Sequence, residues 1–267
     1  MAADEFWEFE RAGWDRAAGA YEECWTDTSL FIAPLLDAAG VSAGTRLLDI
    51  ACGPGFVSEA AVARGAVPTG VDVAESMLER ARLRVPDVEF VLGDAQALSF
   101  GDAAFDAVTL NFGLQHVSKP DLALREARRV LVDGGRLAFT VWVAEGHVAD
   151  EILEVALAAH ALPVSVPEGP DPYRFADAGE SRRALEAAGF AAVAVETVTA
   201  PWRTPTADLL FEAHMHAGLR EGTVLRAQPP ERLEAIRAAI VEGVSRYAEG
   251  DEFVMPIVAR VMSARAG

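Results

Sequence analysis

Short runs of apolar residues alternate, between residues 45 and 143, with segments whose apolar residues recur at helical spacing. Continuous apolar runs are typical of strands buried on both faces of a parallel sheet. We therefore expect strands at 45–51, 67–72, 88–92, 105–110 and 136–143. We expect helices between them at 56–64, 75–84 and 121–131. Strands that alternate with helices in this way predict right-handed βαβ units.

The pattern changes on either side of this alternation. Residues 6–18 and 31–39 have helical patterns, and several aromatic residues up to Trp25 accompany the first. Residues 146–178 contain a helical stretch at 148–161 and then four prolines, and such long connections are usually functional or disordered. The remainder predicts helices at 181–188, 206–216 and 230–247 and strands at 191–199 and 252–263. Pro256 falls inside the last strand, which an edge or a bulge would tolerate.

Composition narrows the class of protein. The chain has 267 residues, of which 51% are hydrophobic, and this is enough for one large α/β domain with a full core. The formal net charge is -18, which repels phosphate backbones, so we expect no nucleic-acid partner.

Cysteine usage and the chain ends indicate a compartment. Cys24 and Cys52 do not make a disulfide framework, and no metal-ligand spacing involves them, so no metal is expected. The acidic N-terminus lacks an apolar signal core, and no apolar run reaches the length of a membrane span. We expect a cytoplasmic protein without a membrane span, and a homodimer is left open.

The first expected strand of the alternation ends in Asp49 and then in a turn of small residues that contains Gly53 and Gly55. The two glycines let the backbone pass close beneath a ligand, because no Cβ is in the way. The helix that follows directs free N–H groups and a partial positive charge at this loop. This arrangement predicts a nucleotide-type ligand site at the carboxyl end of a central strand.

Further motifs indicate which ligand binds there. The dinucleotide-binding fingerprint requires a third glycine, and Ser58 stands in its place. This makes a nicotinamide cofactor a weaker hypothesis without excluding it. Asp72 ends the second strand in the sequence Gly-Val-Asp and can accept both hydroxyls of a ribose. Asp94 follows the third strand in Gly-Asp-Ala and can accept from an adenine amine, although an Asx-turn would also explain it.

The segment from Leu47 to Gly55, together with Asp72, Asp94 and the stretch 111–116, resembles class I S-adenosylmethionine (SAM)-dependent methyltransferases. The chain is most similar to the small-molecule group that includes the ubiquinone/menaquinone-biosynthesis enzymes, also called methyltransferase type 11-like. The resemblance covers about residues 45–139 in register.

The resemblance implies an α/β fold with a Rossmann-like, doubly wound sheet of seven strands. The sheet would be mostly parallel, with an antiparallel last strand beside the fifth, helices on both faces and a helical cap. Residues 1–267 would form one domain. Its parts would be an N-terminal helical cover at 1–40, a SAM-binding core at 45–145, and cap or acceptor-pocket elements at 146–178 and 200–250.

The resemblance also implies the cofactor, SAM, and the residues that bind it. Some of these have structural alternatives, since Asp49 could be a capping acid, Met77 could be core packing, and Tyr21 could simply cover the sheet. The expected cofactor-binding residues are Tyr21, Asp49, Ala51, Gly53, Gly55, Asp72, Met77, Asp94, Ala95 and Asn111.

Methyl transfer from a sulfonium is a direct displacement, so the protein mainly aligns the reactants and excludes water. A base is needed only for a nucleophile that arrives protonated, and His116 is the best candidate. The alternative is that His116 bonds the backbone of its own loop.

We expect methyl transfer to an oxygen, nitrogen or activated carbon of a small, largely apolar or aromatic molecule. A protein that binds SAM without transferring the methyl, as a cyclase or with SAM as a structural prop, is the alternative. A nicotinamide oxidoreductase is the third hypothesis.

Overall fold

The computed structural model describes residues 4–24 and 27–267, so Trp25 lies outside the described residues. An eight-stranded sheet with the order β3-β2-β1-β4-β5-β8-β6 organises the chain, and β7 pairs with β8 beside this path. The strands are β1 (Arg46–Ile50), β2 (Val67–Asp72), β3 (Glu89–Leu92), β4 (Phe105–Asn111), β5 (Leu131–Trp142), β6 (Phe190–Thr204), β7 (Ala248–Glu249) and β8 (Glu252–Ala266).

The first five strands are parallel to one another, and β8 is antiparallel to both β5 and β6. The expected fold class, including the antiparallel last strand beside the fifth, is confirmed. The structure has one strand more than expected, the two-residue β7, which forms a hairpin with β8 and is too short to give a sequence pattern.

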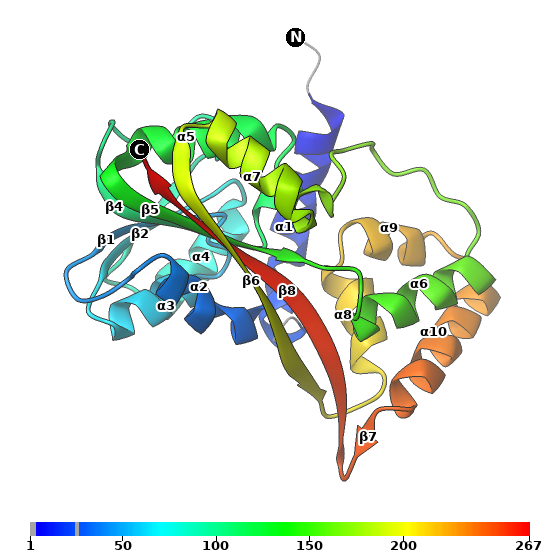
Figure 1. Ribbon diagram of the computed structural model, residues 1–267. Coiled ribbons are helices and arrows are strands. Elements are labelled where there is room, and N and C mark those ends of the chain that lie inside the picture. Colours follow the sequence, from blue (N-terminus) through cyan, green and yellow to red (C-terminus); the bar gives the residue numbers. More distant parts are fainter. Residues whose placement is uncertain (1–3, 25–26) are drawn as a thin grey trace.

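Helices cover both faces of the sheet (Figure 1). Those around the parallel strands are α1 (Glu5–Cys24), α2 (Ile32–Ala38), α3 (Phe56–Ala63), α4 (Glu75–Arg84), α5 (Pro120–Val130) and α7 (Ala178–Ala187). A separate group of helices, called the cap here, comprises α6 (Val148–His160), α8 (Leu209–Ala217), α9 (Arg220–Arg226) and α10 (Pro230–Ser245). Short 3-10 helices are η1 (Thr28–Phe31), η2 (Leu114–His116) and η3 (Arg174–Ala176).

The alternation of side chains along each strand divides the core between the two faces of the sheet. Leu48 and Ile50 of β1 pack into the cluster that contains Leu124 of α5. Leu47, one residue earlier, packs on the opposite face with Leu35 of α2. β1 is therefore apolar at consecutive positions, which is why the sequence shows a continuous apolar run there.

The strands β6 and β8 form a long antiparallel ribbon that carries the cap. Their pairing runs from Phe190↔Ala266 to Thr204↔Phe253, whereas β5 pairs with β8 only as far as Ala259. The outer half of the ribbon therefore continues beyond the sheet, and the cap helices gather beside it (Figure 1). Its side chains form one apolar cluster with α6, α8 and α10.

Pro256 lies opposite Pro201 of β6, in the part of β8 beyond its pairing with β5. β8 as a whole is an interior strand, so the expected edge exists only locally, where the ribbon has left the sheet. Because Pro256 lies where β8 no longer pairs with β5, the N–H that proline lacks removes no hydrogen bond to β5. The strand can therefore continue through this proline.

Several element boundaries differ from the sequence prediction for identifiable reasons. β5 starts at Leu131 rather than residue 136, because residues 133–135 form a bulge within the strand, marked by a register shift and by φ +75° at Gly134. α9 was not predicted, since seven residues give little periodicity. Among the described residues, no helix combines the length and apolarity that crossing a membrane requires.

Candidate functional site

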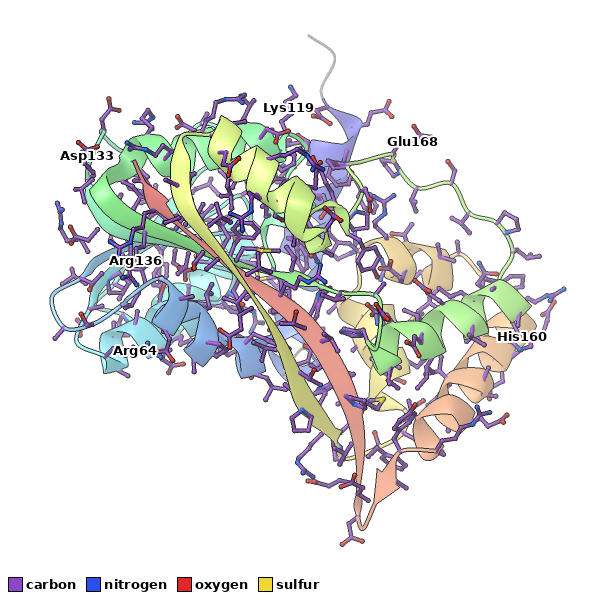
Figure 2. The ribbon with its side chains drawn as sticks, viewed as in Figure 1. Arg64, Lys119, Asp133, Arg136, His160 and Glu168 are labelled. Carbon is purple, nitrogen blue, oxygen red and sulfur yellow. The ribbon has the colours of Figure 1, made fainter. Side chains whose placement is uncertain are left out.

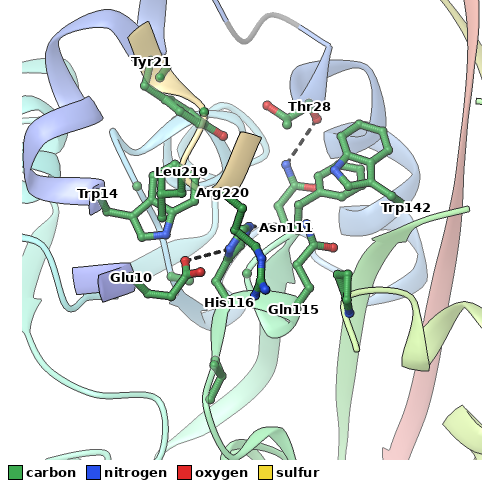
Figure 3. Close-up of a pocket in the computed structure, with 18 of the residues that line it drawn as sticks. Glu10, Trp14, Tyr21, Thr28, Asn111, Gln115, His116, Trp142, Leu219 and Arg220 are labelled. Atoms are coloured by element: carbon green, nitrogen blue, oxygen red, sulfur yellow. Dashed lines mark hydrogen bonds and ion pairs between the residues drawn. The ribbon is translucent and has the colours of Figure 1, made fainter. Parts of the chain in front are cut away.

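A cavity of ≈ 400 Å³ lies at the carboxyl ends of the parallel strands. Strand ends and the loops after them supply its floor, α1 supplies one wall and the cap supplies another. Figure 3 shows Asn111, Gln115 and His116 beneath it, with Tyr21 and Trp14 of α1 on one side and Trp142 on the other. Expected site residues that line it are Tyr21, Ala51, Gly53, Asp72, Met77, Asp94, Ala95, Asn111 and His116.

Asp49 and Gly55 do not line the cavity but hold its glycine loop from below. Asp49 is buried, and its carboxylate accepts hydrogen bonds from Ser58 Oγ (2.9 Å) and Thr109 Oγ1 (3.3 Å). Burial raises the pKa of Asp49 to about 7. Gly55 has φ +86°, and a Cβ there would lie 3.1 Å from that of Ala81 in α4. Both residues therefore fix the position of the loop rather than touch the contents of the cavity.

Asp72 joins the ends of two strands. One carboxylate oxygen accepts from the Gly53 N–H (2.8 Å) and the other from the Ala74 N–H (2.9 Å). Burial raises the pKa of Asp72 although these bonds oppose the rise. A carboxylate has about four acceptor positions, so each oxygen can still accept a further bond from a ligand.

Asp94 is held by its own turn and by α1. The Gln96 backbone N–H donates to it at 2.8 Å, and the Trp7 indole Nε1 donates at 2.9 Å. The Asx-turn alternative is thus present, yet Asp94 also lines the cavity beside Ala95. Met77 is buried among residues of α1 and also lines the cavity, so packing and ligand contact coexist there.

Asn111 is fixed by hydrogen bonds on both ends of its amide. Its Nδ2 donates to the Thr28 carbonyl at 3.2 Å, and its Oδ1 accepts from Thr140 Oγ1 at 2.8 Å. The next residue, Phe112, stacks on Trp142 with ring centroids 3.8 Å apart. The end of β4 is therefore a rigid platform in the middle of the cavity floor.

His116 contacts a buried carboxylate on α1. Its Nδ1 lies 2.9 Å from Glu10 Oε2, and its Nε2 lies 3.3 Å from the Gln115 side-chain nitrogen. The carboxylate favours a proton on Nδ1, which leaves Nε2 as the acceptor for the Gln115 amide. The Trp14 ring packs edge-on against the imidazole at 4.9 Å. The dashed line in Figure 3 marks the Glu10 contact. These are side-chain contacts, and they differ from the backbone bond considered as the alternative for His116.

Glu10 is a lining residue that was not predicted from the sequence. Trp7, Glu10, Trp14 and Tyr21 lie at intervals of three, four and seven residues, so they share one face of α1 and all line the cavity. That spacing was the available signal. It was obscured because an acidic residue on an amphipathic helix normally faces solvent.

Further lining residues come from the cap and from the connection that follows α6. His147 and Asp150 begin α6, Tyr173 comes from the proline-rich connection, and Arg220 begins α9. His214 of α8, which helical position alone did not single out, is buried at the cavity, whereas His216 is exposed and paired with Glu212.

Charge in the cavity is strongly asymmetric. Among the described lining residues, Arg220 is the single lysine or arginine. Carboxyl groups line the same space at Glu10, Asp27, Asp72, Asp94, Asp150, Glu154 and Glu221. Such a site favours a ligand with net positive charge and repels a polyphosphate. No group of three or more metal-ligating side chains occurs in the described part of the chain.

Comparisons with known proteins agree with this geometry. Residues 48–139 match the methyltransferase domain family. A demethylmenaquinone methyltransferase of Renibacterium salmoninarum is 44% identical over 103 residues, which are 39% of this chain and 44% of the relative. The chain therefore matches less than half the length of such curated relatives. The resemblance to the ubiquinone/menaquinone-biosynthesis group is confirmed over this core.

Solved structures share the fold at low identity. A phosphoethanolamine N-methyltransferase of Haemonchus contortus, in complex with S-adenosylhomocysteine, superimposes with a TM-score of 0.54 at 19% identity, covering 94% of this chain and 57% of that one. The [4+2]-cyclase SpnF has a TM-score of 0.54 at 24% identity, covering 89% and 80% of the two chains. These likenesses confirm the fold and leave the chemistry to the site.

The buried Asp49 predicts a pH-dependent stability. Its carboxyl has a pKa of about 7 in the folded protein against about 4 when unfolded, so the stability it supports is full below pH 4 and lost as pH rises to 7. Asp49→Asn removes this titration. We expect the free energy of unfolding of the variant, minus that of wild type, to increase by roughly 2–4 kcal/mol between pH 4 and pH 8. Urea denaturation across this pH range measures it.

The control is Asp133→Asn, whose side chain is 94% exposed, and it should run parallel to wild type across this range. A constant difference between Asp49→Asn and wild type would contradict the assignment.

Proposed function

We propose that this chain is a SAM-dependent methyltransferase acting on an oxygen, nitrogen or activated carbon of a small, largely apolar or aromatic molecule. One observation carries the proposal. Asp72 ends β2 and Asp94 follows the adjacent β3 beside a glycine loop, in a cavity whose described lining residues include more carboxyl groups than the one guanidinium. The sulfonium and ammonium of SAM outweigh its carboxylate, so its charge suits this site.

The residues present fit this cofactor in several places. A Cβ at Gly53 would meet nothing within 4 Å, so the loop leaves open space above it. We propose that Asp72 accepts the ribose hydroxyls with its free acceptor positions, and that Asp94 and Ala95 contact the adenine against Met77. Asn111, Ala51 and Tyr21 would surround the methionine end. Asp49 and Gly55 would act through the loop.

A nicotinamide cofactor fits less well. Its pyrophosphate would enter a space lined by Glu10, Asp27 and the other carboxylates, with Arg220 as the one cation among the described lining residues. Desolvating phosphate beside carboxylates is unfavourable without further cations.

We propose His116 as the base for acceptors that arrive protonated. SAM would supply an electrophilic methyl group, and the chain would hold the acceptor in line with it and exclude water. Glu10 fixes the imidazole through Nδ1, so Nε2 is the basic nitrogen, and it would exchange its bond from the Gln115 amide for the proton of the methyl acceptor. The cavity is assembled from α1, the strand ends and the cap, which enclose it together.

We also propose the division of labour within the single domain. Residues 45–145 would bind the cofactor, residues 1–40 would cover it, and segments 146–178 and 200–250 would shape the acceptor pocket. One chain supplies the whole cavity, so a homodimer would not be needed to complete it. Cys24 and Cys52 are buried and are not joined in a disulfide, which together with the negative charge supports a cytoplasmic enzyme without nucleic-acid substrates.

The SAM-binding protein that transfers no methyl is the second candidate, and the cyclase of the same fold supports it. To separate the two, the protein is incubated with SAM and a panel of small phenols, amines and enolisable ketones. We expect S-adenosylhomocysteine together with a methylated product by mass spectrometry. SAM binding by calorimetry without S-adenosylhomocysteine formation on any panel member would favour the second candidate.

Asp72→Asn should weaken SAM binding by roughly tenfold or more, because charge-assisted hydrogen bonds to the ribose are lost. Isothermal titration calorimetry of the folded variant measures this directly. Asp106→Asn, which removes a half-exposed carboxylate paired with Arg46 at the other end of the sheet, serves as the matched control. Equal affinities for wild type and Asp72→Asn would sink the ribose assignment.

His116→Ala should lower turnover by roughly a hundredfold while SAM affinity is retained, if the imidazole is the base. His216→Ala removes an exposed, paired histidine and should leave both quantities unchanged. A purely structural His116 would instead lower stability and SAM affinity together. Near-normal turnover of His116→Ala at saturating acceptor would end the base assignment.

A further inference from the structure

We infer that the cap end of the cavity contains an acceptor-recognition site in which His147 donates a hydrogen bond from Nε2 to a neutral oxygen of the substrate. The inference rests on the proposed function and specifies the chemistry of the acceptor. The oxygen would belong to a ketone, ester, ether or un-ionised hydroxyl on an apolar skeleton. It would be a recognition group, separate from the atom that is methylated.

The protonation of His147 is set by its place in the fold. His147 is the N-cap of α6, and its Nδ1 accepts from the Asp150 backbone N–H at 3.3 Å. Burial lowers the pKa of His147 to about 4, so the imidazole is neutral at neutral pH. With Nδ1 as acceptor, the one ring proton lies on Nε2. The Trp142 ring packs edge-on against the imidazole at 4.8 Å and fixes its orientation.

The Nε2–H donor has no hydrogen-bond partner in the described structure, although only 3% of His147 is exposed. Buried donors are nearly always satisfied, because an unmade hydrogen bond costs the full desolvation of the group. His147 lines the cavity, so its ring borders the space where a ligand would lie. A hydrogen-bond acceptor that enters the cavity is therefore the partner that this donor lacks.

The surroundings exclude an anionic substrate and favour a largely apolar one. Leu153, Leu157, Trp202 and Leu210 line the same part of the cavity, from α6, the ribbon and α8. Carboxyl groups also lie there, and a carboxylate or phosphate on the substrate would be repelled by Asp150, Glu154 and Glu221.

The Asp150 carboxyl already has a donor, since the Tyr173 hydroxyl lies 3.3 Å from its Oδ2. The Asp150 carboxylate lies 3.5 Å from His147 Nδ1, which already accepts from the Asp150 backbone N–H. This carboxylate is therefore on the Nδ1 side of the ring and is not the partner of Nε2. Within this cluster the unmet demand is thus for an acceptor at Nε2. An ammonium group would not meet that demand, because it has no lone pair to offer.

The test uses matched pairs of probes in which the carbonyl oxygen of a ketone is replaced by a CH2 group. These are 2-acetylnaphthalene with 2-isopropenylnaphthalene, and 4-acetylbiphenyl with 4-isopropenylbiphenyl. Binding to the full-length protein is measured by calorimetry, with and without S-adenosylhomocysteine. In wild type we expect the ketone of at least one pair to bind about tenfold more tightly than its hydrocarbon partner.

In His147→Phe we expect this preference to disappear while the hydrocarbon still binds, and His147→Gln should restore part of it. His160→Phe is the matched control, because His160 lies at the far end of α6, does not line the cavity, and should leave the preference intact (Figure 2). A panel in which no ketone binds better than its partner overturns the inference. So does a preference that survives in His147→Phe.

Two measurements keep the outcome clear. Nitrogen-15 NMR of the wild-type histidines should show His147 as the neutral Nε2–H form, with its signal moving when the ketone binds, and an Nδ1–H form would overturn the inference even if the variants fail to fold. S-adenosylhomocysteine binding is titrated separately. Its absence would refute the proposed function, whereas the comparison of probes without cofactor reports on His147 alone.

Discussion

The structure depends on one carboxylate that ties two loops together. Asp72 accepts from the Gly53 N–H in the loop after β1 and from the Ala74 N–H at the start of α4. Together with the Cys52 N–H, which donates to the Val71 carbonyl at 3.1 Å, it fixes the distance of the glycine loop from the neighbouring strand. Desolvation alone would make this buried charge costly, and its backbone hydrogen bonds offset part of that cost.

The close packing around this point transmits its position to the rest of the site. A Cβ at Gly113 would lie 2.5 Å from that of Ala51, so the loops after β1 and β4 approach more closely than any side chain would permit. A Cβ at Gly70 would lie 2.5 Å from the Phe90 ring, and β2 meets β3 equally closely. The floor of the cavity is therefore one rigid layer, and α1 and the cap form the walls above it.

Local pattern predicted what local interactions determine. β2 and α4 match their expected bounds because an apolar run and an acidic helix start define them within a few residues. The extent of β6 and β8 could not be predicted, since it depends on pairing between segments some sixty residues apart. Glu10 was missed for a similar reason, because it was identified by its contact with His116, which is 106 positions away in the chain. The unpartnered donor of His147 could not be predicted either, since it becomes visible only once the burial of the ring and its contact with the Asp150 N–H are known.

The ribbon of β6 and β8 has a consequence for how such a protein can change over time. The cap packs on the outer half of the ribbon in a cluster distinct from the two clusters on the faces of the sheet. Substitutions in separate clusters act nearly independently on stability. Replacements along α6, α8 and α10 can therefore reshape one half of the cavity while the strand ends keep their spacing. The architecture allows divergence at one end and constancy at the other within a single folded unit.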